Sequence, residues 1–270
     1  MSGQVGLRSK AWFQALTGQT SPMNGDPGSV LAADARLGED NARFLCVVPD
    51  AQARFPCARH GEVGLEEAYT LAARVREVIG RDSGQKKTPI VAIVDVKSQA
   101  YGRREGTAGI FLAAAAATDA YATARMKGHP VITLVVGQAI SGGFLTHGYQ
   151  ANRILAFDDP GVVIHAMHKE AAARITLRSV AELERLGHEI LPMSYDIRDY
   201  AKLGLLHKLL RIENPDTPSQ DTVAQVQQEL IAAIADSRSG STDLGNRVKS
   251  EWRRAGLAAR ARMKEQWALA

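Results

Sequence analysis

The segment that most constrains this chain is residues 130–157, PVITLVVGQAISGGFLTHGYQANRILAF. An apolar run typical of a buried strand leads into Ser141, Gly142 and Gly143, and the residues that follow predict the start of a helix. A strand that delivers adjacent glycines to a helix N-terminus directs unobstructed N–H groups, and the positive end of the helix dipole, at one point. Such a point suits an oxyanion that develops during a reaction.

The neighbouring segments alternate between buried strands and helices. Apolar runs predict strands at residues 44–48, 89–95 and 131–136, and helical spacing predicts helices at residues 65–79 and 105–126. This alternation predicts an α/β fold with largely parallel strands.

The second half of the chain is predicted to add shorter elements. Strands are expected at residues 153–157 and 161–165, and a helix at residues 178–189. Residues 196–210 predict a helix, a glycine C-cap at Gly204 and a terminal strand.

Composition divides the chain into three predicted parts. Residues 1–40 are rich in Gly, Pro, Asn and Asp, which predicts an N-terminal arm with a short helix at residues 12–16 whose order depends on docking. Residues 41–212 are the main domain. Residues 213–270 are predicted to be a C-terminal helical extension.

The composition also restricts the class of protein. A chain of 270 residues with 45% hydrophobic content can bury a full core. Its apolar runs are shorter than the roughly 20 residues that a membrane helix needs, and its first residues do not resemble a signal peptide, so we expect a cytoplasmic protein with no membrane association. Cys46 and Cys57 are too few for a disulfide framework or a zinc site, and we expect buried or idle thiols and no metal.

The net charge of +4 is concentrated near the C-terminus. Residues 247–265 hold seven basic and two acidic residues, so the rest of the chain is close to neutral. Trp252, Leu257, Met263 and Trp267 lie among these charges and predict a helix with an apolar stripe and a cationic face. That face is either solvated or a docking surface for an acidic protein. No known nucleic-acid-binding motif is present, so no nucleic-acid partner is expected.

Three short motifs occur in a defined order. They are Val94-Asp95 with Ala100-Tyr101-Gly102, then Val135-Val136-Gly137 with Ser141-Gly142-Gly143, and then Ala201-Lys202-Leu203-Gly204-Leu205-Leu206. Together they resemble the carboxyltransferase branch of the crotonase/ClpP-like superfamily. Within that branch the chain is similar to the gamma subunit of biotin-independent malonate decarboxylase, over roughly residues 44–210.

This resemblance implies a crotonase-like spiral of ββα units, extended by the arm and the C-terminal helices. It implies a hetero-oligomer in which the active site is shared with a homologous beta subunit. The reaction would be that of a carboxy-lyase, in which a malonyl thioester on an acyl carrier protein loses CO₂ to become the acetyl form. The carrier's thiol would belong to a phosphoribosyl-dephospho-CoA prosthetic group, so this chain would bind no cofactor of its own.

The resemblance also assigns the oxyanion-binding residues. Gly142 falls where the family's oxyanion-hole N–H lies, with Gly143 beside it, and the Tyr101-Gly102 loop is where a second donor is expected. The alternative is that both glycines serve helix packing and that Tyr101-Gly102 is a simple turn. Ser141 is either a nucleophile or a helix cap. It lacks the G-x-S-x-G elbow, so we expect a cap.

A second group of candidates follows the strand at residues 161–165. His165, Met167 and His168 fall where related carboxyltransferases line the substrate pocket. An imidazole there would be suited to protonating an enolate, although a histidine in this position also serves packing. Lys97 and the Arg103-Arg104 pair flank the tyrosine loop and would attract a carboxylate or phosphates, or form a solvated loop.

Two departures from the carboxyltransferase pattern favour the decarboxylase. Val96-Lys97-Ser98-Gln99 stands where relatives often have a proline and a glycine, and Gly137-Gln138-Ala139-Ile140 replaces the common Gly-Glu-Gly-Gly. Two other functions stay open. One is the carboxyltransferase half of a biotin-dependent acyl-CoA carboxylase, and the other is a non-catalytic subunit that docks the carrier protein.

Overall fold

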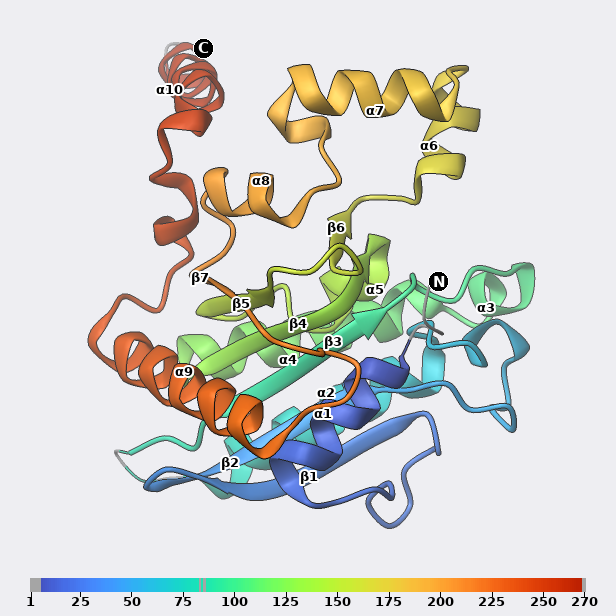
Figure 1. The fold of residues 1–270 in the computed structure, drawn as a ribbon, viewed down its shortest axis with the longest axis vertical. Coiled ribbons are helices and arrows are strands. Elements are labelled where there is room, and N and C mark those ends of the chain that lie inside the picture. Colours follow the sequence, from blue (N-terminus) through green and yellow to red (C-terminus); the bar gives the residue numbers. More distant parts are fainter. Residues whose placement is uncertain (1–5, 83, 85, 269–270) are drawn as a thin grey trace.

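The structure, a computed structural model, describes residues 6–82, 84 and 86–268. It is built on one seven-stranded sheet in the order β1-β2-β3-β4-β5-β7, with β6 paired to β4 (Figure 1). The strands are β1 (Val30–Leu37), β2 (Asp40–Val47), β3 (Ile90–Val96), β4 (Val131–Ile140), β5 (Arg153–Phe157), β6 (Val163–His165) and β7 (Lys208–Leu210). Among the described residues, only β1 and β2 pair antiparallel, and the other strand pairs are parallel. The predicted α/β class with a largely parallel sheet is therefore confirmed.

Helices cover both faces of this sheet. Figure 1 shows α1 and α9 on one face and α2 and α4 on the other, with α6, α7 and α8 beyond the ends of β4 and β6. The helices are α1 (Leu7–Thr17), α2 (Leu65–Arg81), α3 (Arg103–Thr107), α4 (Ile110–Met126), α5 (Ser141–Thr146), α6 (Lys169–Thr176), α7 (Val180–Glu189), α8 (Ile197–Lys202), α9 (Gln220–Ser239) and α10 (Arg254–Ala268). Short 3₁₀ turns are formed by Pro56–Ala58, Leu191–Met193, Gly245–Val248 and Glu251–Arg253. Because β3 is covered on both faces, all of its residues are buried.

The expectation of a separate N-terminal arm is wrong for residues 7–37. Helix α1 packs on the sheet, where Trp12 and Phe13 are fully buried, and β1 is the edge strand paired with β2. The backbone N–H of Gly6 donates to the carboxylate of Asp95 at 2.7 Å, which ties the start of α1 to the end of β3. The Gly- and Pro-rich composition misled the prediction because it describes the turns between these elements. Residues 1–5 of the predicted arm lie outside the described residues, as do residues 83 and 85 of the polar stretch after α2.

The single helix expected over residues 105–126 is two helices. Gly109 separates α3 from α4 and has a φ of 86°, in the left-handed region that ends an α-helix. The break lets α3 start directly after Tyr101 and Gly102. Helix α6 was not predicted from the sequence, and its eight residues make only about two turns.

The C-terminal extension contains the two expected helices. No side chain of α10 is buried, and Figure 1 shows this helix projecting from the body of the molecule. Arg247 departs from the predicted cationic face because its guanidinium is buried and donates to the backbone oxygens of Tyr149 and Ala151. Burial lowers the pKa of Arg247 to about 10. Within the described residues, no helix combines the length and the hydropathy that a bilayer crossing requires.

Candidate active site at the ends of β3 and β4

The candidate site forms where two parallel strands end side by side. β3 ends at Val96 and β4 at Ile140, and parallel neighbours bring their carboxyl ends to the same edge of a sheet. The loop after β3 is held by Val63, whose N–H donates to Ser98 O at 3.0 Å and whose carbonyl accepts from Ala100 N–H at 2.9 Å. This brings the loop against the start of α5.

The N–H of Gly142 is directed into this loop. It donates to Oε1 of Gln99 at 2.7 Å, so a carbonyl-type oxygen already occupies this donor. A Cβ at Gly142 would lie 2.8 Å from the same Gln99 oxygen, and that contact is with the end of a flexible side chain. Gly142 therefore offers a donor that can exchange one oxygen for another.

Gly143 has a different reason to be glycine. Its Cβ would lie 2.6 Å from the carbonyl carbon of Ser98, a backbone atom that the ladder with Val63 holds in place. Only glycine lets the chain approach so closely. The two predicted glycines thus separate into one whose N–H is bonded to a movable side chain and one that is required for packing.

Ser141 is not the predicted helix cap. The N-cap of α5 is Ile140 and makes no side-chain capping bond, and the Ser141 hydroxyl lies 2.8 Å from the hydroxyl of Tyr101. Ser141 has a φ of 60°, a left-handed conformation unusual for a residue other than glycine. Helix α5 has six residues, so the dipole contribution expected from a full helix is small.

The Tyr101-Gly102 loop leads directly into α3. Gly102 is the N-cap residue, with an extended φ of 177°, and a Cβ there would lie 2.8 Å from Cδ of the buried Glu105. This close contact explains why residue 102 is glycine. Whether Gly102 is a second donor to the oxyanion stays a prediction. The side chain of Tyr101 is 62% exposed and faces Ser141.

Pairing of β6 with β4 places His165 beside the site. It is the register partner of Ile140 in the β4·β6 ladder, one residue before Ser141. Its ring stacks on Tyr195 with centroids 3.8 Å apart, and its Nδ1 lies 3.0 Å from Met167 O. Burial lowers the pKa of His165.

His168 closes the other side of the loop. Its Nε2 lies 3.0 Å from Lys97 O, and the carbonyl is the acceptor in this bond. The side chain of Lys97 lies 3.9 Å from Glu62, and Arg104 lies over the ring of Phe55. These contacts place the predicted histidines and cations around the loop, where their roles in the reaction stay predictions.

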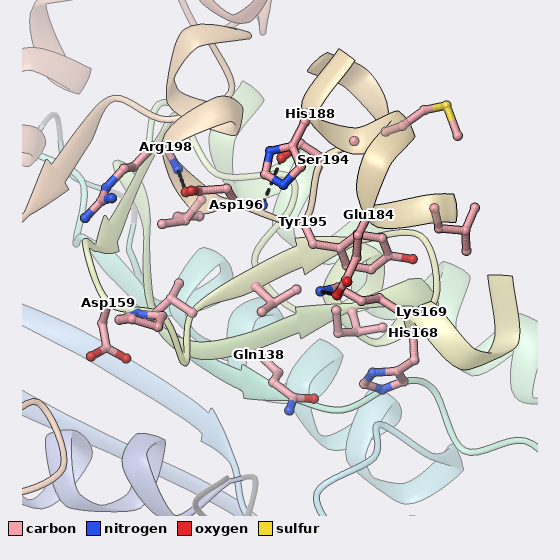
Figure 2. Close-up of a pocket in the computed structure, with 18 of the residues that line it drawn as sticks. Gln138, Asp159, His168, Lys169, Glu184, His188, Ser194, Tyr195, Asp196 and Arg198 are labelled. Carbon is pink, nitrogen blue, oxygen red and sulfur yellow. Dashed lines mark hydrogen bonds and ion pairs between the residues drawn. The ribbon is translucent and has the colours of Figure 1, made fainter. Parts of the chain in front are cut away.

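A cavity of about 630 Å³ adjoins the site, between the ends of β4 and β6 and helices α6 to α8. Ile140 and His168 line it and also border the loop after β3. Figure 2 shows Tyr195 and the Lys169–Glu184 ion pair on its helical side and Gln138 on the sheet side. Oε1 of Gln138 is buried and has no hydrogen-bond partner among the described residues.

Sequence analysis did not identify Gln99, Tyr195 or Lys169 as site residues. Gln99 and Gln138 fall in the two segments that depart from the carboxyltransferase pattern. Those departures are the sequence feature that could have pointed to these two residues as part of the site. Tyr195 comes from a part of the chain without a motif, so only the tertiary structure places it against His165.

A separate polar cluster lies buried behind the site. His147 Nδ1 lies 2.9 Å from the Tyr121 hydroxyl, and its Nε2 lies 3.1 Å from the carbonyl oxygen of Ile93. Since that carbonyl can only accept, Nε2 carries the proton and Nδ1 accepts from the tyrosine. Burial lowers the pKa of His147 to about 4. Both ring nitrogens of His147 are thus bonded to groups other than Ser141.

The described residues contain no group of three His, Cys, Asp or Glu side chains placed to hold a metal ion. Cys46 is buried, as expected for an idle thiol, and burial raises its pKa. Cys57 lies next to Glu105, whose carboxylate raises the pKa of the thiol.

Comparison with solved structures gives close matches over nearly the whole chain. A Pseudomonas malonate decarboxylase hetero-tetramer in complex with coenzyme A contains a chain 52% identical, with a TM-score of 0.92, over 96% of this chain and 99% of that chain. A Pseudomonas malonate decarboxylase MdcD-MdcE hetero-dimer matches at 52% identity and a TM-score of 0.89, with the same coverage.

More distant structures show the fold alone. Transcarboxylase 12S matches at 18% identity with a TM-score of 0.58, over 79% of this chain and 38% of that chain. The beta subunit of geranyl-CoA carboxylase from P. aeruginosa matches at 16% identity with a TM-score of 0.57, over 82% of this chain and 40% of that chain. These are crotonase-fold carboxyltransferases, and the predicted crotonase-like fold is confirmed.

Sequence comparisons give the family. A curated relative from Malonomonas rubra, the malonyl-S-ACP:biotin-protein carboxyltransferase MADD, is 37% identical over 167 residues. The match spans 59% of this chain and 56% of that relative, a little over half its length. The family model described as malonate decarboxylase gamma subunit matches residues 58–267, which include the site and all three sequence motifs. The chain therefore belongs to the malonate decarboxylase gamma subunit family.

Proposed function

We propose that this chain stabilises the oxyanion in a shared site that decarboxylates a malonyl thioester carried on an acyl carrier protein. The single observation that supports this most is the Gly142 N–H, which lies at the end of β4 and already donates to an amide oxygen of Gln99. An incoming thioester oxygen has the same acceptor character as that amide oxygen. It would replace Gln99 on this donor.

The chemistry needs such a donor. When the carboxylate leaves as CO₂, the electron pair of the broken C–C bond moves into the thioester and forms an enolate. Its negative charge collects on the thioester oxygen, where a donor already in place lowers the barrier without reorganisation. Loss of one such donor costs about 2.7–4 kcal/mol, or on the order of 10²–10³ in rate.

The partners follow from the names of the similar proteins. The similar Pseudomonas chains occur in an MdcD-MdcE hetero-dimer and a hetero-tetramer, and we propose a homologous beta subunit as the partner here. The substrate is malonyl-S-acyl carrier protein, whose thiol belongs to a phosphoribosyl-dephospho-CoA group. This chain itself binds no cofactor, and the complex works in the cytoplasm.

A second candidate function rests on the curated relative. MADD is named as a carboxyltransferase that uses a biotin protein, so a carboxyl transfer to biotin is the alternative fate of the malonyl carboxylate. The two reactions differ in one requirement. Carboxyl transfer needs a biotinylated acceptor, whereas decarboxylation releases CO₂ without one.

The test measures CO₂ release from malonyl-loaded acyl carrier protein, first by this chain alone and then by its complex with the beta subunit. The same complex is then made with Gly142→Val, in which the added side chain meets the flexible end of Gln99. The matched control is Gly256→Val on α10, where an added Cβ meets nothing within 4 Å.

We expect turnover by the wild-type complex without biotin, unchanged turnover by the Gly256→Val complex, and a loss of about 10²-fold or more with Gly142→Val. Turnover only with a biotinylated acceptor would replace decarboxylation by carboxyl transfer. A folded Gly142→Val complex with full turnover would contradict the catalytic role of Gly142. It would favour a non-catalytic subunit that docks the carrier protein.

A further inference from the structure

The hydroxyl groups of Tyr101 and Ser141 form a pair at the mouth of the candidate site. They are 2.8 Å apart, one in the loop after β3 and the other at the first residue of α5, 40 residues apart in sequence. Ser141 directly precedes Gly142, so the pair lies beside the donor proposed for the enolate oxygen. An enolate has its nucleophilic carbon two bonds from that oxygen.

The position of Ser141 is set by its backbone. It follows the last residue of β4 and has a φ of 60°, which orders the turn between strand and helix. Backbone strain of this kind costs about 1–3 kcal/mol and is retained where a side chain must be aimed. The side chain it aims here makes no capping bond to α5 and contacts the Tyr101 hydroxyl instead.

Tyr101 is also held at its base while its ring stays open to solvent. The preceding Ala100 is buried and donates its N–H to Val63 O at 2.9 Å, and the following Gly102 caps α3. The ring itself is 62% exposed, and its hydroxyl contacts the hydroxyl of Ser141. Tyr101 therefore has an anchored backbone, a solvent-exposed phenol and a hydroxyl partner. A phenol in this setting can donate a proton and be reprotonated by water.

The two histidines near the site are engaged in other contacts. His165 is stacked on Tyr195 with Nδ1 at the Met167 backbone, and His168 uses Nε2 to bind Lys97 O. Burial lowers the pKa of His165, so its ring is protonated less readily than a free imidazole. The phenol of Tyr101 contacts the hydroxyl of Ser141, the residue directly before Gly142.

We propose that Tyr101 protonates the enolate carbon, with Ser141 as the residue that positions it. This inference rests on the proposed function. Departure of CO₂ breaks a C–C bond and leaves its electron pair in the enolate. The carbon then takes the phenol proton and forms a C–H bond, which gives the acetyl thioester and a phenolate. The Ser141 hydroxyl keeps its hydrogen and donates a hydrogen bond to the phenolate oxygen. Solvent water then transfers a proton to the phenolate and leaves hydroxide, so one proton is consumed per CO₂ released.

The test separates protonation from C–C cleavage. If the enolate is not protonated, it can recapture CO₂ and re-form the malonyl thioester. The complex with the beta subunit is therefore supplied with malonyl-loaded acyl carrier protein and isotopically labelled CO₂. The measured quantity is the ratio of label returned to the malonyl thioester to acetyl thioester formed. The variants are Tyr101→Phe and Ser141→Ala, and the matched control is Tyr69→Phe, an exposed tyrosine on α2.

A general acid typically contributes about 10²–10⁴ in rate, so we expect Tyr101→Phe to raise this ratio by about tenfold or more. Ser141→Ala should raise it less, because the phenol remains, and Tyr69→Phe should match the wild type. An equal fall in exchange and acetyl formation, or an unchanged ratio, would overturn the role of Tyr101. Failure of the wild-type complex to release CO₂ would instead overturn the proposed function, so the two failures are distinguishable.

Discussion

Two sets of polar side chains border the same strand ends, and they differ in how completely they are bonded. In the interior, on either face of the sheet, Asp95 accepts two backbone N–H groups, and His147 is bonded at both ring nitrogens. At the open edge, Gln99 and Tyr101 contact Gly142 and Ser141 through side-chain atoms that solvent reaches.

The difference follows from burial. A buried polar group left without a partner costs about 1–3 kcal/mol, so the inner set is fully bonded and holds the fold together. At the edge, water replaces a lost partner, so contacts there can be exchanged for substrate. Hydrogen bonding thus serves the architecture where the side chains are buried and stays available for chemistry at the open edge.

The two adjacent glycines give the sharpest test of this contrast. Gly143→Ala should destabilise the chain by at least about 3 kcal/mol, because its methyl group would overlap the Ser98 backbone. Gly142→Ala should change the unfolding free energy by less than about 1 kcal/mol, since the Gln99 side chain can move away. Chemical denaturation measures both, with Gly80→Ala as the control at a position where a Cβ meets nothing within 4 Å. Equal destabilisation by both variants would break the distinction.

The buried side chains should also make the free energy of unfolding depend on pH. His147 has a folded pKa of about 4, below the value near 6.5 of an unfolded histidine, so the unfolded state binds more protons in between. Stability is therefore complete above about pH 6.5 and falls as the pH drops toward 4, by on the order of 3 kcal/mol from this residue.

His147→Gln removes that contribution. The variant should be less stable at pH 7 and should lose less stability between pH 6.5 and 4 than the wild type, when unfolding is followed at several pH values. The difference between the two slopes removes the contribution of the carboxylates, which also lowers the stability of both proteins in acid. The control is His60→Gln at an exposed site, which should keep the wild-type slope. A His147→Gln slope equal to that of the wild type would contradict the structural role.

The smallest effect is expected at the open edge. Gln99→Ala frees the Gly142 N–H, so the substrate no longer has to displace a hydrogen bond worth about 0.5–1.5 kcal/mol. We expect KM for malonyl carrier protein to fall by a few-fold, up to about tenfold, with little change in stability. Steady-state kinetics of the complex measure this, with Gln228→Ala on α9 as the control. A rise in KM would show that Gln99 holds the substrate and does not occupy its place.

Most of the sheet could be predicted from local patterns. Strands β3 and β5 are apolar apart from Asp95 and Arg153, and a run of that kind is stable only when covered on both faces. The first helix and strand could not be recognised as parts of the core. Trp12 makes an edge contact with Phe157 from the other end of the domain, and a pairing of that separation leaves no local signal.

For the candidate site, the sequence by itself determined where the glycines fall and which strand delivers them. Order and spacing along the chain also identified the family, because motifs on parallel strands keep their positions when loops vary. These properties are local, since they depend on the residue types that a strand end and a tight turn require.

Only the tertiary structure decided what each residue of the site contacts. It gave Gly142 and Gly143 different roles, and it showed that Ser141 contacts Tyr101 and does not cap a helix. It also showed that the Gly142 N–H donates to the side chain of Gln99. The physical reason is that these contacts join two loops about 40 residues apart, brought together by the parallel pairing of β3 and β4. The distance across that pairing, and the direction of each hydrogen bond, exist only once the sheet has formed.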